Sequence, residues 1–131
     1  MIGAMEQLPE DLLELDQQVC FALAVASRSV IRMDRPILEP LGLTHPQYLV
    51  MLALWGESSL RFREIAERLR LDPATLSPLV KRLEQSGLIE REPVVGDDRT
   101  FSLVPTEAGW ELRKQALSVP QAVIDRLGLP L

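Results

Sequence analysis

The chain has 131 residues, of which 47% are hydrophobic and 25% are charged. This length suits one compact domain, and the composition excludes an intrinsically disordered chain, which would be less hydrophobic and more highly charged. One cysteine excludes a disulfide within the chain, and we expect it to be a free thiol.

The formal net charge of -5 arises entirely within residues 1–20, which have five acidic and no basic side chains. Positive and negative charges balance in the remainder, so the acidic total does not exclude a local DNA-binding face. The acidic start lacks the basic flank of a secretory signal, and no apolar run approaches the roughly 20 residues of a membrane span. We therefore expect a cytoplasmic protein with no membrane partner.

Residues 10–33 have apolar side chains at intervals of three and four, which predicts a long amphipathic helix. Asp34, Pro36 and Pro40 should interrupt this helix, because proline removes a backbone donor and disfavours helix in the residue before it. Gly42 should close the segment.

The segment "LTHPQYLVMLALWG" predicts a second helix, with Thr44 as N-cap, Gln47 completing a capping box, and an end near Trp55. The segment "RFREIAERLRL" predicts a short third helix. Asp72 and Pro73 should start a fourth helix that ends before glycine 87. Two short helices joined by a tight turn have the length of a helix-turn-helix motif.

The segment "LIEREPVVGDDRTFSLVP" predicts a β-hairpin, because a Gly-Asp-Asp turn separates two short runs and the second run alternates apolar and polar residues. Thr106 should then cap a last helix that is interrupted near Pro120. The expected fold class is therefore mainly α with a small β-hairpin wing, a winged helix-turn-helix.

The fourth helix has polar residues pointing away from its apolar stripe, and these are the candidate DNA contacts: Thr75, Ser77, Lys81 and Arg82. Hydroxyl donors can reach base edges, and cations can reach phosphates. On an isolated helix the same residues would simply be a solvated face. Pro78 lies among them, and it either bends the helix toward a groove or is tolerated there.

Arg99 at the hairpin tip is a candidate wing contact, and Asp97 is a candidate support that orients its guanidinium. Glu90 and Glu92 in the same hairpin oppose DNA binding, so we expect modest and salt-sensitive affinity.

Cys20 is either a small buried hydrophobe or a reactive thiol, which would need exposure and a nearby cation. His45 is the one histidine, and together with one cysteine it is too little for a zinc site, so we expect no metal. The sequence has neither a glycine-rich phosphate loop nor a nucleophile elbow. We expect no cofactor and no enzymatic activity.

The segments "LDPATLSPLVKRLEQSGLIERE", "DDR" and "PTEAG" resemble the MarR family of bacterial winged-helix transcription regulators. The segments "QQVCFALAVASR" and "PILEPLGLTHPQYLVMLALW" resemble its organic hydroperoxide resistance regulator branch. The resemblance implies a single domain over residues 1–131. Residues of about 10–42 and 106–131 would be dimerisation helices, and about 44–104 the winged helix-turn-helix lobe.

The resemblance further implies a homodimeric repressor that places two recognition helices in successive major grooves of a pseudo-palindromic operator of double-stranded DNA. It implies that Cys20 is the redox sensor: its thiolate attacks an organic hydroperoxide to give a sulfenic acid, and the dimer leaves its operator.

The chain departs from the branch at the tyrosines that reach the sensor thiol across the dimer, which align with Asp34 and His45. Ala24 replaces another aromatic residue. Asp34, His45 and Tyr48 are therefore the candidate partners of Cys20; a protonated histidine would favour the thiolate and a carboxylate would disfavour it. Without a second cysteine, a mixed disulfide with a small thiol is one available product. The family's last helix extends further, so we expect a truncated form or a dimer with fewer contacts.

Three alternatives remain open. The first is a repressor controlled by a small aromatic or acidic ligand, bound between the dimerisation helices and the lobe, with Cys20 only structural. The second is a thiol peroxidase built on Cys20. The third is a winged-helix protein-interaction module that does not bind DNA.

Overall fold

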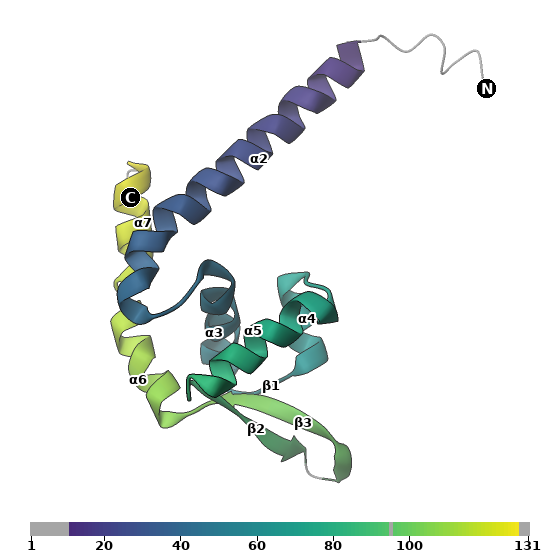
Figure 1. The fold of residues 1–131 in the computed structure, drawn as a ribbon, viewed down its shortest axis with the longest axis vertical. Coiled ribbons are helices and arrows are strands. Elements are labelled where there is room, and N and C mark those ends of the chain that lie inside the picture. The colour runs from purple at the N-terminus through teal and green to yellow at the C-terminus, as the bar shows by residue number, and fades with distance from the viewer. Residues whose placement is uncertain (1–10, 95, 129–131) are drawn as a thin grey trace, which may run out of the picture. The chain divides into compact units, whose positions relative to one another are not determined.

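The computed structural model describes residues 11–94 and 96–128, apart from the side chains of residues 11 and 97–99. Figure 1 shows its helices and strands. The chain divides into two compact units, residues 1–33 and residues 34–131.

The first helix, α2, runs from Asp11 to Leu38. The expected interruption at Asp34 and Pro36 is wrong, because the helix continues through both residues. Leu38, only 1% exposed, belongs to the hydrophobic core, and this packing offsets the backbone hydrogen bond lost at Pro36. A short 3-10 helix, η1 (Glu39–Leu41), follows, and Gly42 ends it with a φ of 73°, as expected for a closing glycine.

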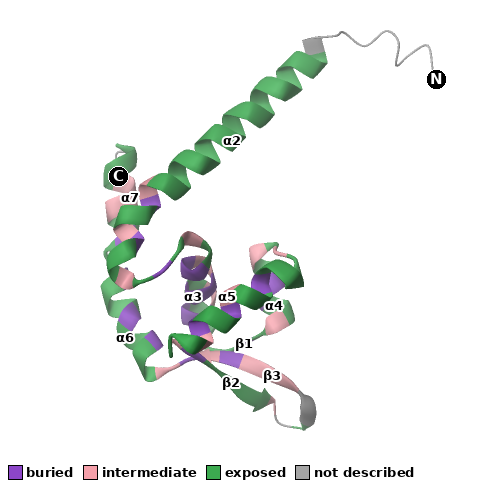
Figure 2. Cartoon of the chain, in the orientation of Figure 1, coloured by how far each residue is buried: buried purple, intermediate pink, exposed green. Residues whose placement is uncertain are grey.

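The part of α2 in the first unit has no buried residue in the described range, residues 12–33 (Figure 2). Many of its exposed side chains are large and apolar, although an isolated helix in water gains nothing from exposing them. They are Leu12, Leu13, Leu15, Val19, Phe21, Leu23, Val25, Val30 and Ile31.

The second helix of the prediction is α3 (His45–Glu57), and its capping box is confirmed. The backbone N–H of Gln47 donates to Thr44 Oγ1 at 3.4 Å, and the backbone N–H of Thr44 donates to the side-chain oxygen Oε1 of Gln47 at 2.9 Å. These two bonds satisfy backbone donors that have no partner within the helix, which is why the helix starts here.

The helix-turn-helix pair is α4 (Phe62–Leu69) and α5 (Pro73–Gln85), as predicted. Asp72 stands at the N-cap of α5, but its side chain makes no capping hydrogen bond there.

The wing consists of β2 (Ile89–Val94) and β3 (Asp97–Pro105), which confirms the predicted hairpin. The sequence did not predict β1 (Leu60–Arg61), which pairs with β3 and gives an antiparallel sheet in the order β1-β3-β2. The predicted Gly-Asp-Asp turn of the hairpin is longer than the turn in the structure, because Asp97 already belongs to β3 and pairs with Val94 of β2.

The last helix is divided at the predicted place into α6 (Glu107–Ala116) and α7 (Val119–Leu127). Thr106 caps α6 by accepting a hydrogen bond of 3.1 Å from the Gly109 amide. A Cβ at Gly109 would collide with the Leu88 carbonyl oxygen, so glycine permits the close approach of α6 to the chain before β2. The Trp55 indole donates to the Gly109 carbonyl at 3.0 Å and ties α3 to α6.

The second unit has a continuous hydrophobic core to which α3, α4, α5, α6 and the sheet all contribute. Its fully buried large side chains are Leu38, Val50, Met51, Leu54, Ile65, Leu76, Leu83, Ile89 and Leu103. This core holds α5, which is the recognition helix of the helix-turn-helix pair, and the wing in one unit. The predicted fold class is confirmed. Among the described helices, none combines the length and the apolar character needed to cross a membrane.

Candidate DNA-binding surface and sensor cysteine

The residues of α5 that the sequence predicts to contact DNA are all exposed: Thr75, Ser77, Pro78, Lys81 and Arg82. The other side of the helix is buried in the core through Leu76, Val80 and Leu83. Because the buried side fixes the rotation of α5, hydroxyl and cationic side chains are presented to solvent together, as a major-groove contact requires. Proline is accommodated on the exposed side without ending the helix.

The wing residues Asp97 and Arg99 belong to strand β3, but their side chains lie outside the described residues. Their predicted ion pair and DNA contact stay predictions. Glu90 and Glu92 are exposed on β2, and their negative charge is unfavourable near phosphate.

Sequence reasoning missed Arg91, which links the wing to the recognition helix. Its Nε lies 3.2 and 3.1 Å from the two carboxylate oxygens of Glu84 on α5. Its guanidinium carbon lies 4.4 Å from the centre of the Phe101 ring on β3, a cation-π distance. The β2–β3 register of the folded hairpin makes residues 91 and 101 diagonal neighbours on one face, and the sequence alone does not give this register.

Cys20 is an exposed free thiol on α2 and is no part of the core. Its Sγ lies 3.8 Å from Oδ1 of Asp16, one turn earlier on the same helix. The thiol donates a hydrogen bond to this carboxylate, and its exposure favours reaction with a peroxide.

Asp34, His45 and Tyr48, the candidate sensor partners, lie close together in the second unit. His45 Nδ1 lies 2.9 Å from Asp34 Oδ2, within ion-pair distance but without hydrogen-bond direction. Asp34 is buried, and its Oδ1 has no hydrogen-bond partner among the described residues. Burial, and secondarily the Asp34 carboxylate, raises the pKa of Tyr48 above its ordinary value of 10.0. Cys20 belongs to the other unit, and its meeting with this cluster stays a prediction.

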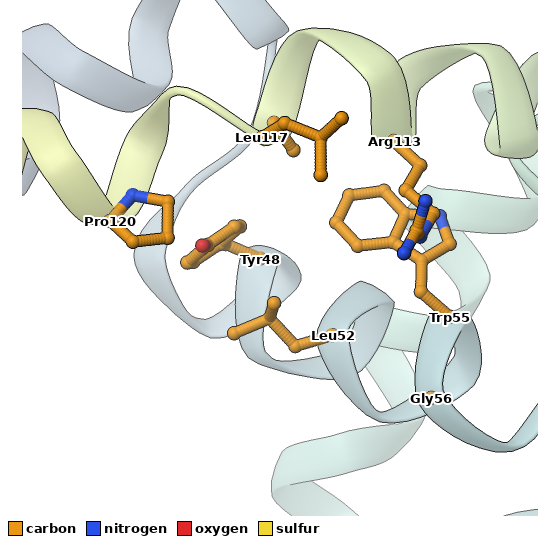
Figure 3. A pocket seen from close by; sticks show the side chains of 8 residues that line it. Tyr48, Leu52, Trp55, Gly56, Arg113, Leu117 and Pro120 are labelled. Atoms are coloured by element: carbon orange, nitrogen blue, oxygen red, sulfur yellow. The ribbon is translucent and has the colours of Figure 1, made fainter.

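A cavity of about 270 Å³ lies between α3 and the two last helices (Figure 3). It is lined by Tyr48, Leu52, Trp55, Gly56, Arg113, Ala116, Leu117 and Pro120. Apart from the guanidinium of Arg113, the Tyr48 hydroxyl and the Trp55 indole N–H, the lining side chains are apolar. The cavity therefore suits a small aromatic molecule with one anionic group.

Residues 43–101 match the MarR family model. The organic hydroperoxide resistance transcriptional regulator of Bacillus subtilis is 38% identical over 114 residues, which cover 87% of this chain and 78% of that protein. The HTH-type transcriptional regulator TtmR of Methylorubrum extorquens is 41% identical over 122 residues, which cover 93% of this chain and 63% of that protein.

Among solved structures, reduced AbfR bound to DNA is similar with a TM-score of 0.81 and 31% sequence identity, covering 91% of this chain and 87% of that one. A disulfide form of AbfR, a Staphylococcus epidermidis protein, is similar with a TM-score of 0.69 and 32% identity, covering 94% and 86%. The Bacillus subtilis and Methylorubrum extorquens relatives are named as transcriptional regulators. The winged helix-turn-helix, the family match and these similarities together show that the chain belongs to the MarR family and is a DNA-binding transcriptional regulator.

Proposed function

We propose that the protein is a homodimeric repressor that leaves a pseudo-palindromic operator when an organic hydroperoxide oxidises Cys20. The observation that carries the proposal is the exposed Cys20 thiol on a helix that also exposes many large apolar side chains. The similarity to an organic hydroperoxide resistance regulator supports this choice of oxidant. An operator lies on chromosomal DNA, so we propose that the protein acts in the cytoplasm.

The homodimer is supported by the exposed apolar side chains of α2 in residues 12–31. Burying one large apolar side chain contributes about 1.5–3 kcal/mol, so covering several of them with a second copy drives association. A two-fold dimer presents two copies of α5, which explains why the operator would be pseudo-palindromic.

The oxidation is a two-electron step in which the thiolate of Cys20 attacks one oxygen of the hydroperoxide. An S–O bond forms, the O–O bond breaks, and the departing alkoxide takes a proton and leaves as an alcohol. The cysteine is then a sulfenic acid. Because the sequence has one cysteine, a small cellular thiol can condense with it to give a mixed disulfide and water.

A gel shift with the DNA upstream of the protein's own gene tests the proposal. Cumene hydroperoxide should release the wild-type protein, whereas Cys20→Ser should stay bound at the same peroxide concentration. Equal release of both proteins would remove Cys20 from the mechanism, and a wild-type protein that binds no DNA would contradict the repressor itself.

We propose further that Asp34, His45 and Tyr48 serve Cys20 of the partner copy, with His45 providing the positive charge. His45→Ala should then slow the oxidation of Cys20 by cumene hydroperoxide, followed by intact mass. Arg126→Gln, at an exposed arginine of α7, is the control for loss of a basic side chain elsewhere. An unchanged rate in His45→Ala would exclude the histidine as activator.

The cavity beside Arg113 favours a second candidate function, in which a small aromatic anion controls DNA binding and Cys20 is only structural. Benzoate is a suitable probe, because its ring fits an apolar lining and its carboxylate can pair with a guanidinium. In a Trp110→Phe background, benzoate should quench Trp55 fluorescence and should release DNA to the same extent with and without the further change Cys20→Ser. No quenching by benzoate at millimolar concentration would reject this candidate for aromatic carboxylates.

A further inference from the structure

A hollow of about 410 Å³ lies between the recognition helix α5 and the wing, on the side of the molecule already assigned to DNA. From α5 it is lined by Ser77, Val80, Lys81, Glu84 and Gln85, from the wing by Arg91 and Phe101, and from α4 by Phe62. The polar α5 residues Ser77, Lys81, Glu84 and Gln85 follow at intervals of four, three and one, which places them on adjoining positions of the same helix face.

Arg91 is held in this hollow by two different groups. The carboxylate of Glu84 receives its Nε–H, and the Phe101 ring lies under its guanidinium plane. The Glu84 side chain is 25% exposed and the Arg91 side chain is 55% exposed, so the pair lies at the rim of the hollow and remains open to solvent. As a surface ion pair it would stabilise the fold by little, about 0–1 kcal/mol.

The contacts of Arg91 with Glu84 and Phe101 instead suit the orientation of its guanidinium as a hydrogen-bond donor. A guanidinium has five N–H bonds, of which the bond at Nε points to Glu84, and the terminal amino groups supply the others. Lys81 adds a second cation, and Ser77 and Gln85 add uncharged donors. With Glu84 counted, the charged side chains lining the hollow leave one net positive charge, which matches an anion.

We propose that this hollow holds one phosphate of the DNA backbone, with Arg91 as a contact residue and with Glu84 and Phe101 as positioning residues that fix its guanidinium. The proposal rests on the DNA-binding function and adds residues that the sequence did not suggest. It explains why an acidic side chain stands on the recognition helix: Glu84 orients the cation that meets the phosphate.

The test measures DNA affinity of the full-length dimer by fluorescence anisotropy between 50 and 300 mM KCl. One labelled duplex of 30 base pairs has random sequence, and a second comes from upstream of the protein's own gene. Each phosphate contact contributes about 0.9 to the slope of log K against log salt, so Arg91→Gln should lower the slope by about 1.8 in a dimer. The loss should be similar on both duplexes, because phosphate contacts are not sequence-specific.

The variant Glu84→Gln tests whether Glu84 acts by orienting the Arg91 guanidinium or only through its negative charge. Removing a negative charge near DNA should tighten binding if only net charge matters, whereas loss of the arginine's support should weaken it severalfold. We expect weaker binding. Glu92→Gln, at an exposed carboxylate of β2 outside the hollow, is the matched control and should bind more tightly.

Arg126→Gln, at an exposed arginine of α7, controls for loss of a positive charge elsewhere and should leave the slope unchanged. Thermal unfolding checks that each variant is folded; if Arg91→Gln is not, Arg91→Lys should keep the slope but lose affinity.

An unchanged slope in Arg91→Gln, or tighter binding by Glu84→Gln, would overturn the phosphate site while leaving the DNA-binding function intact. A wild-type protein that binds neither duplex would overturn both.

Discussion

The two units of the chain differ in whether they bury their apolar side chains. Among the described residues, 34–94 and 96–128 bury most of their large apolar side chains in a core that joins helices and sheet, whereas residues 12–33 bury none of theirs. The second unit thus contains everything needed to hold the recognition helix and the wing in place. The described part of the first unit leaves large apolar side chains exposed, and it is also the unit that has the thiol. We therefore propose that each chain holds its own DNA-contacting elements in place, and that the exposed apolar helix with the thiol serves the association of two copies.

The largest expected effect comes from breaking the association of the first unit. Leu23→Asp places a carboxylate on the exposed apolar face of α2, twice in a symmetric dimer. We expect the dimer dissociation constant to rise at least about a hundredfold, which corresponds to roughly 2.7 kcal/mol. Sedimentation at several protein concentrations measures it.

Ser59→Asp is the control, at an exposed residue of the second unit between α3 and β1. It should leave the dimer intact. If Leu23→Asp also left it intact, α2 would not be the dimer interface in the way we propose.

A substitution in the hydrophobic core tests whether the second unit is stabilised by its own buried side chains. Leu54 is fully buried, and Leu54→Ala should lower the free energy of unfolding by about 2–5 kcal/mol through lost burial and a cavity. Denaturant unfolding at one fixed protein concentration gives the value. Leu52→Ala, two residues earlier and exposed, should cost far less, and equal costs at the two positions would contradict the described core.

A smaller effect is expected at the link between α3 and α6. Trp55→Phe keeps an aromatic ring but removes the donor that bonds the Gly109 carbonyl at 3.0 Å. The loss should be about 0.5–1.5 kcal/mol, plus a desolvation cost if the carbonyl stays buried without a partner. The same unfolding assay checks it, and an unchanged midpoint would show that the bond contributes nothing.

The smallest effect concerns alkaline pH. Folding raises the pKa of Tyr48 through burial and through Asp34, so above pH 10 the unfolded chain loses this proton before the folded chain does. The stability contributed by the neutral hydroxyl is complete below pH 10 and is lost as the pH rises through the folded pKa. Tyr48→Phe should unfold less steeply with pH in this range. Identical pH profiles would exclude Tyr48 as the titrating group.

Local signals in the sequence predicted the elements that local interactions create. The capping box of Thr44 and Gln47 marked the start of α3, and Thr106 marked α6. Such hydrogen bonds join residues three positions apart, so the sequence alone contains both partners.

Long-range contacts explain what the sequence could not predict. The helix α2 passes Pro36 because Leu38 reaches the core, and β1 is a strand only because β3 pairs with it. Arg91 went unnoticed because its two neighbours, Glu84 and Phe101, come from different elements, so only the folded wing brings them together.

The most direct test of the account follows DNA release and Cys20 oxidation in the same samples. The dimer, bound to labelled DNA from upstream of its own gene, is titrated with cumene hydroperoxide and read by anisotropy and by intact mass. The account predicts that DNA is released in proportion to the Cys20 oxidised, and that Cys20→Ser releases none. Release that precedes any change in the mass of the protein, or full oxidation with DNA still bound, would contradict it.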